Sequence, residues 1–168
     1  MQHTNHTWLR WWRHLSMTRW QLRRAFPDSG LQAITECVKH SEQLHGGEIR
    51  VAIEADLSVA ALLRGQTPRA RALEVFAALG VWDTQARNGV LVYLCLADHS
   101  VEIVADRGLR GRIDDDQWSA ICEQLQADCA ASRYEQGVCS AVIAVGQALG
   151  RYYPVADRNE QSDRPVLL

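Results

Sequence analysis

The sequence has no long hydrophobic run and none of the short motifs that mark common enzymes. No apolar stretch approaches the roughly 20 residues that a transmembrane helix needs. The N-terminal segment has Arg, His and Asn where a signal peptide would have its apolar region. The nucleotide-binding, zinc-protease and serine-hydrolase patterns do not occur, and no cysteine is followed six residues later by arginine. These absences predict a cytoplasmic protein without an organic cofactor.

Cysteine is present, but its spacing has no recognisable pattern. The number of cysteines is 5, which is odd, and no two of them form a CxxC pair. Most of them lie within apolar helical or strand patterns, so we expect buried free thiols rather than a disulfide framework or a zinc site. Free thiols are typical of a reducing compartment. The residues concerned are Cys37, Cys95, Cys122, Cys129 and Cys139.

Acidic residues are absent from the first 26 positions. That segment carries a formal charge of +5 from its five arginines, whereas the whole chain has a formal net charge of −2. The remaining residues therefore carry a formal net charge of −7. The low overall charge argues against a nucleic-acid partner. The sequence therefore predicts a basic N-terminal arm, residues 1–26, followed by an acidic body.

The arm is rich in tryptophan, and its periodicity predicts a helix over residues 3–25. The tryptophans could pack on the body, dock on a second subunit of a homo-oligomer, or lie on an anionic membrane such as the inner face of the cell membrane. We expect a protein or membrane partner to contact residues 8–26, principally Trp8, Trp11, Trp12, Arg13 and Trp20.

The spacing of apolar residues in the body predicts alternating strands and helices. Strands are expected at 48–55, 89–96 and 101–106, with a helix over 68–79 between the first two. The order strand, helix, strand predicts a right-handed parallel crossover, and the short break ADHS predicts an antiparallel hairpin. Strand 48–55 places Arg50 and Glu54 on a less buried face, so we expect it near a sheet edge.

With helices expected at 31–44, from Asp114 onwards and at 134–153, the predicted fold is α/β. It is a three-layer α/β/α sandwich with a central mixed β-sheet, made of the crossover and the hairpin strand, and an added N-terminal helix. The predicted organisation is the arm 1–26, an α/β domain 27–154 and a flexible polar tail 155–168.

Polar residues gather at the hairpin end opposite its turn. Asp83, Asn88 and Asp106 are expected to meet there and to supply the oxygen ligands that Ca²⁺ or Mg²⁺ prefers. Arg87 or Arg107 would then hold a phosphate against the cation. In the structural alternative, Asp83 caps a turn, Asn88 supplies a left-handed position before Gly89, and Asp106 pairs with an arginine. Helix capping explains the acids at 114–116 more simply than metal ligation does.

The body resembles the TPM domain family over residues 31–154. The resemblance rests on EIRVAIE at 48–54, RAxxVF at 71–76, NGVLVYL at 88–94, VEIVADRG at 101–108 and YExG at 134–137. Family members include thylakoid-lumen proteins of photosystem II repair and many bacterial proteins. The resemblance implies a mixed sheet with helices on both faces, acid-phosphatase-like hydrolysis, calcium binding and roles in membrane-protein maintenance. Unlike the commonest family plan, this sequence shows no signal peptide or anchor.

These observations predict a binding domain that recognises a metal ion or a protein. The alternative is a divalent-metal-assisted phosphomonoesterase, for which Asp83, Asp106 and Arg107 are the candidate catalytic residues.

Overall fold

The computed structural model describes residues 3–154 and 160–168. Its centre is a sheet of four strands in the order β3-β2-β1-β4, made of β1 (Glu48–Glu54), β2 (Gly89–Cys95), β3 (Ser100–Ala105) and β4 (Val166–Leu167). β1 and β2 are parallel, with Glu48 opposite Gly89. β2 and β3 form the antiparallel hairpin, with Val90 opposite Ala105. The predicted crossover and hairpin are both confirmed.

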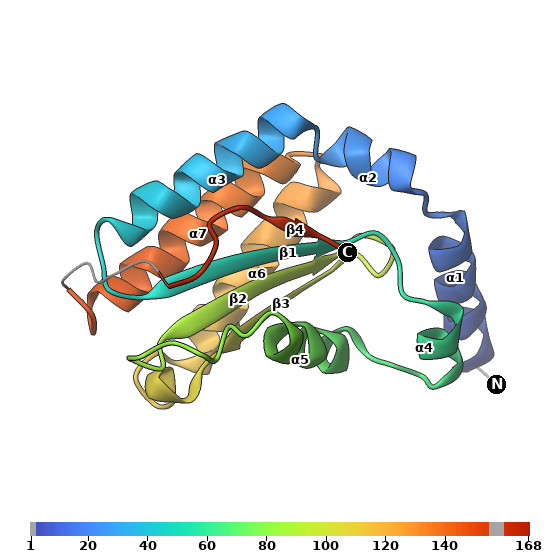
Figure 1. Ribbon diagram of the computed structural model, residues 1–168. Coiled ribbons are helices and arrows are strands. Elements are labelled where there is room, and N and C mark those ends of the chain that lie inside the picture. Colours follow the sequence, from blue (N-terminus) through green and yellow to red (C-terminus); the bar gives the residue numbers. More distant parts are fainter. Residues whose placement is uncertain (1–2, 155–159) are drawn as a thin grey trace.

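Helices cover both faces of this sheet (Figure 1). One face carries α3 (Asp28–Glu42), α6 (Asp115–Ala130) and α7 (Tyr134–Gly150), and the other carries α5 (Pro68–Ala78). The alternation of β1 divides its side chains between two apolar clusters: Ile49 and Ile53 face the three-helix layer, and Ala52 faces α5. Every residue of β2 is buried because the strand is covered on both faces. The predicted α/β/α layering is therefore confirmed.

The N-terminal segment forms two helices rather than the single one expected. α1 (His3–Ser16) ends before Thr18, and α2 (Arg19–Ala25) begins after it. Thr18 is extended and forms a capping box with Gln21: its hydroxyl accepts from the Gln21 backbone N–H, and the Gln21 side chain accepts from the Thr18 N–H. These bonds satisfy free donors at the start of α2 and break the helix there.

The end of the chain differs from the expected flexible tail. β4 pairs in parallel with β1, with Ala52 opposite Val166, and the Leu168 N–H donates to the Ile53 carbonyl at 2.9 Å. β1 therefore lies next to the edge strand β4, which agrees with its predicted place near an edge, and β4 pairs with only two of its residues. Two apolar residues are too few to predict a strand from the sequence alone. Val166 and Leu167 form a strand because backbone groups of β1 are available to pair with them. Residues 155–159 of the predicted tail lie outside the described residues.

Two of the five cysteines are joined. A disulfide links Cys37 on α3 to Cys139 on α7, with Cα atoms 5.7 Å apart, so the prediction of free thiols is wrong for this pair. The two residues lie 102 positions apart, and only the packing of the helices brings them together. The disulfide also removes the cysteine-based argument for a reducing compartment. The other three thiols are free, and burial raises the pKa of Cys95 to about 12.

None of the helices in the described ranges combines the length and the apolar character needed to span a bilayer.

Candidate functional site

Asp106 lies directly after β3, at the end of the hairpin opposite its turn. Its backbone N–H donates to the Gly89 carbonyl at 2.9 Å, which extends the β2–β3 ladder by one residue. Its Oδ1 accepts the Arg107 backbone N–H at 2.7 Å and so caps a short 3₁₀ helix, Arg107–Leu109. The residue is only 8% exposed, and Oδ2 is buried without a hydrogen-bond partner among the described residues. Within the described residues, Oδ2 is therefore an unsatisfied acceptor.

Asn88 lies at the same end of the sheet, but its amide is already used. Its Nδ2 donates to the Gly46 carbonyl, and its Oδ1 accepts the Thr84 hydroxyl at 3.2 Å. The first bond joins the loop before β2 to the turn before β1, and the second lies within that loop. The left-handed residue expected at Asn88 is its neighbour Arg87, with φ 54°, so that detail of the structural alternative is wrong.

Asp83 lies on the exposed surface of the same loop, where its backbone N–H donates to the Gly80 carbonyl at 2.9 Å. The structure thus brings Asp106 and Asn88 to one end of the sheet and leaves Asp83 at the surface. In the described part of the chain, no three His, Cys, Asp or Glu side chains are grouped so that they could hold a metal ion. The acids at 114–116 are exposed at the start of α6.

Two glycines allow the loop before β2 to pack tightly against the Asp106 segment. A Cβ atom at Gly89 would overlap the Val81 carbonyl oxygen, and one at Gly108 would overlap the Arg87 carbonyl oxygen. The Gly108 N–H donates to that same Arg87 oxygen at 3.0 Å. Only a residue without a side chain fits at either position. The surroundings of Asp106 are therefore a closely packed junction of loops.

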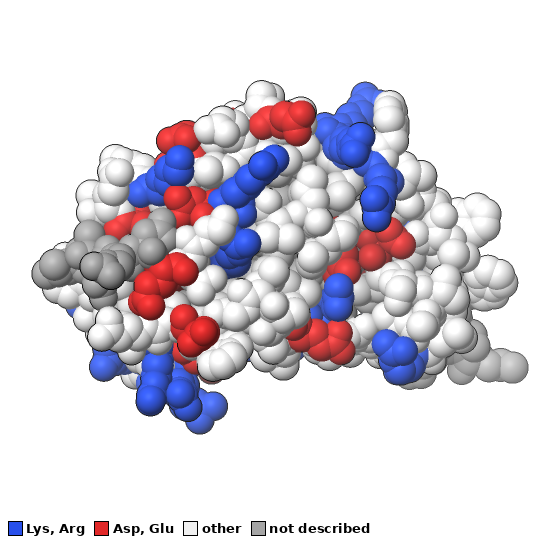
Figure 2. Space-filling model, viewed as in Figure 1, with Lys and Arg blue, Asp and Glu red and all other residues white. Residues whose placement is uncertain are grey.

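Exposed arginines lie on the loops that form this junction. In Figure 2, blue side chains gather at the lower left, over the turn that follows β3. The Arg112 guanidinium lies over the ring of Tyr153, 5.4 Å from its centroid. A buried carboxylate on loops that also carry arginines suits a cation that is itself bound to an anion. The arginines are Arg87, Arg107, Arg110 and Arg112.

A second polar cluster is buried between the sheet and α5, and the sequence reasoning missed it. Arg71 donates to both carboxylate oxygens of Glu54, at 2.8 Å from Nη2, and the Tyr93 hydroxyl donates to Glu54. Burial is the main cause that raises the pKa of Tyr93. Glu54 is buried here rather than half-exposed, because α5 covers it and Arg71 neutralises it. All three side chains are partnered, so we assign the cluster to the stability of the core.

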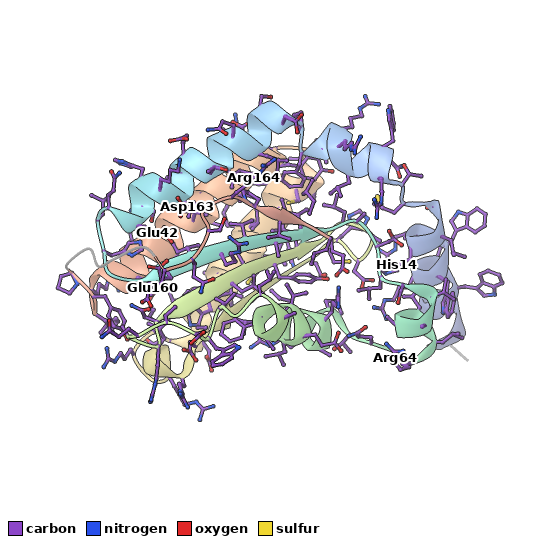
Figure 3. The ribbon with its side chains drawn as sticks, viewed as in Figure 1. His14, Glu42, Arg64, Glu160, Asp163 and Arg164 are labelled. Carbon is purple, nitrogen blue, oxygen red and sulfur yellow. A yellow bond between two sulfur atoms is a disulfide. The ribbon has the colours of Figure 1, made fainter. Side chains whose placement is uncertain are left out.

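A third cluster attaches the arm to the body. Asp98, in the hairpin turn, accepts from Arg10 Nε and Nη2, each at 2.8 Å. It also lies 3.0 Å from Nε2 of His14, which is labelled on α1 in Figure 3. His14 Nδ1 accepts the Leu57 N–H at 2.9 Å, which places the ring proton on Nε2. Burial favours the neutral form of Asp98, but the bonds from His14 and Arg10 outweigh it and hold its pKa well below the usual range.

A cleft of about 580 Å³ lies between α2, the hairpin and the α6–α7 junction. Its lining includes Trp20, Arg24, His99 and Tyr134. None of the residues predicted for the metal site lines it, so the cleft and the Asp106 junction are separate features.

Comparison with known proteins assigns the chain to a family. The model of the TPM domain matches residues 23–148, three quarters of the chain. The chain belongs to the TPM domain family. The solution structure of the BA42 protein from the psychrophilic bacterium Bizionia argentinensis is 26% identical, with a TM-score of 0.68 over 83% of this chain and 93% of that one. No curated protein matches the chain.

A second solved structure shares the TPM fold. It is the N-terminal domain of a protein from P. gingivalis, 21% identical, with a TM-score of 0.60 over 79% of this chain and 82% of that one. The family match begins at residue 23, so α1 and the Thr18 cap lie before the TPM domain as the family model defines it. The Asp106 junction and the Glu54–Arg71 pair fall inside the match.

Proposed function

We propose that this TPM domain binds a divalent cation, Ca²⁺ or Mg²⁺, at the Asp106 junction. The observation that carries the proposal is the buried Oδ2 of Asp106, which has no hydrogen-bond donor in the described structure. Burying an ionised oxygen without a partner is costly, and a cation removes that cost. Hard cations prefer carboxylate oxygen, which is what Asp106 offers.

The remaining ligands would come from the loops and from water. The Asn88 amide is committed to Gly46 and Thr84, so its role would be to position the loop rather than to coordinate through a free group. Asp83, exposed on that loop, would add long-range attraction for a cation. With one buried carboxylate, we expect a dissociation constant on the order of 10⁻⁴–10⁻³ M, as in weak calcium modules.

Thermal unfolding in increasing CaCl₂ or MgCl₂ tests this proposal. At ten times the dissociation constant, binding stabilises by about 1.4 kcal/mol, which raises the Tm by roughly 3–6 °C. D106N should abolish the rise, and D83N should weaken it. D116N, which removes an exposed acid from α6, is the matched control and should behave as wild type. An equal rise for wild type and D106N would rule out this site.

The alternative function is phosphomonoester hydrolysis at the same junction. The exposed arginines around Asp106 favour it, because guanidinium groups match phosphate oxygens. A bound divalent cation would supply an activated water. Asp106 would hold that cation, and Arg107 and Arg87 would orient the phosphate. The described residues hold no nucleophile–base pair of standard type at this junction, so we rank cation binding first.

Hydrolysis of p-nitrophenyl phosphate with Mg²⁺ or Ca²⁺ separates the two functions. Turnover that is lost with EDTA, D106N and R107Q would establish the phosphomonoesterase. A Tm rise with cation, but no turnover above the D106N background, is the result that the binding domain predicts.

A further inference from the structure

Helix α1 turns a polar face toward the body and an apolar face toward solvent, which is the reverse of an ordinary surface helix. The face that contacts the body carries Arg10 and His14, and His14 is only 2% exposed. The opposite face carries Trp8, Trp12 and Leu15, which are 71%, 66% and 61% exposed. In water an amphipathic helix normally buries its apolar stripe and exposes its polar one. This reversed orientation leaves an apolar face that needs a partner outside the chain.

The orientation is fixed by specific bonds. Arg10 makes two bonds to Asp98 and a third, of 2.7 Å, from Nη2 to the Gln66 carbonyl. His14 is held between Asp98 and the Leu57 N–H. Trp11 packs against the apolar cluster on the α5 side of the sheet. Rotating α1 to bury the exposed stripe would break these contacts, so Trp8, Trp12 and Leu15 are held outward.

Further apolar side chains extend the exposed region. Leu9 on α1, Trp20 on α2, and Val59 and Leu63 on α4 (Val59–Leu63) are each more than half exposed. Together with Trp8, Trp12 and Leu15 they make up 7 of the 14 large hydrophobic residues that are exposed in the described chain. The concentration in α1, α2 and α4 distinguishes this end of the molecule from scattered surface hydrophobics.

The charge around this face indicates what binds it. Arg13, Arg19, Arg23 and Arg24 are exposed, and residues 1–26 contain no acid. In Figure 2, basic side chains lie over α2 at the upper right, beside the white surface over α1. A second copy of the chain would bring two arms of equal positive charge together, which is unfavourable. An anionic surface would be attracted instead.

We propose that the exposed face of α1 docks on an anionic lipid bilayer, with α1 lying in the headgroup region. Tryptophan suits this region because its ring is apolar and its N–H finds polar partners, and arginine pairs with lipid phosphates. The remainder of the chain, at −7, would be repelled by the same surface, so the protein would approach with its arm first.

Flotation with lipid vesicles in the presence of EDTA tests the proposal independently of any cation at Asp106. Vesicles of phosphatidylglycerol and phosphatidylcholine in equal parts should bind the full chain, and vesicles of phosphatidylcholine alone should bind it at least tenfold more weakly. Binding should fall as salt rises from 50 to 300 mM, because the attraction is electrostatic. D106N should bind like wild type.

Matched variants separate the apolar and the basic contributions. W8Q/W12Q changes two exposed tryptophans and should weaken binding at least tenfold, whereas W82Q, at a tryptophan 51% exposed outside the arm, should not. R19Q/R23Q should also weaken it about tenfold, whereas R110Q/R151Q should have no more than a twofold effect. All four variants alter exposed side chains, so unchanged circular dichroism and Tm would show that they fold.

Three results would overturn the proposal. One is the absence of binding to the anionic vesicles. Another is equal binding to neutral vesicles, which would refute the charge argument. The third is a dimer in sedimentation velocity that W8Q/W12Q converts to a monomer without any vesicle binding, since the face would then be a contact between two copies of the chain.

Discussion

Arg10, on the first helix, holds Asp98, 88 residues further along the chain, through two hydrogen bonds of 2.8 Å. The pair joins the N-terminal arm to the turn of the β2–β3 hairpin. Its two residues lie in different parts of the chain: Arg10 precedes the residues that match the TPM family model, and Asp98 lies among them. The attachment of α1 therefore depends on an acid that the TPM domain itself supplies.

Replacing Asp98 by asparagine should release α1. The change leaves Arg10 without a charged partner, and the amide nitrogen of asparagine cannot accept from Arg10 Nη2 as Asp98 Oδ2 does. Breaking a half-buried pair of this kind costs about 2–4 kcal/mol. Amide hydrogen exchange should become much faster over residues 3–16, with little change in β1 and β2. Equal protection of α1 in wild type and D98N would mean that the pair does not hold the helix.

The Cys37–Cys139 disulfide should contribute substantially to stability. It closes a loop of 102 residues between α3 and α7. Constraining the unfolded chain over such a loop stabilises a domain by about 2–4 kcal/mol. C37S/C139S should lower the free energy of unfolding by that amount in urea without changing the circular dichroism spectrum. C122S, at a half-buried free thiol, is the control and should have a smaller effect. Unaltered stability on adding dithiothreitol to wild type would contradict the prediction.

Glu42 should make stability depend on pH. Burial is the main cause that raises the pKa of Glu42 to about 8, and repulsion from Glu48 and Asp163 adds to it (Figure 3). Its unfolded value is near 4.5, so between these limits the folded state binds more protons than the unfolded state. The stabilisation is fully present below pH 4.5 and is lost as the pH rises through about 8. We expect a loss of about 1–2 kcal/mol, allowing for partial exposure.

E42Q provides the comparison for this prediction. Glutamine keeps an acceptor for the Ile49 N–H, which Glu42 Oε1 receives at 2.8 Å, and it can donate to Asp163 at every pH. Urea unfolding at pH 5.0, 6.5 and 8.5 should show a smaller decline for E42Q than for wild type. Parallel declines in the two proteins would assign the pH dependence to other groups.

The sheet could be predicted from the sequence because its signals are local. The alternation of EIRVAIE, the apolar run at Gly89–Cys95 and the break before Ser100 determine the crossover and the hairpin, and hence the place of Asp106 beside Gly89. The break between α1 and α2 also had a local signal, the Thr18–Gln21 capping box, which the tryptophan periodicity concealed.

The features that the sequence did not reveal depend on long-range contacts. β4 is a strand only because β1 offers it unpaired backbone groups, and Cys37 meets Cys139 only because α3 packs on α7. The Asn88 amide reaches Gly46, 42 residues away, so its use as a structural bond could not be read from its neighbours. Packing on the body was one of three alternatives for the tryptophans of α1. Trp11 does pack there, whereas Trp8 and Trp12 stay exposed because Asp98 holds Arg10 on the other face of the helix.

The measurement that tests the proposed function most directly is a backbone amide NMR titration of the full chain with Ca²⁺, and then with Mg²⁺. Saturable shifts at millimolar cation, centred on Asp106–Gly108 and on the Asn88 loop and lost in D106N, are the predicted result. Shifts that stay spread over the exposed acids, or that persist in D106N, would contradict the assignment of a cation to the buried Asp106 oxygen.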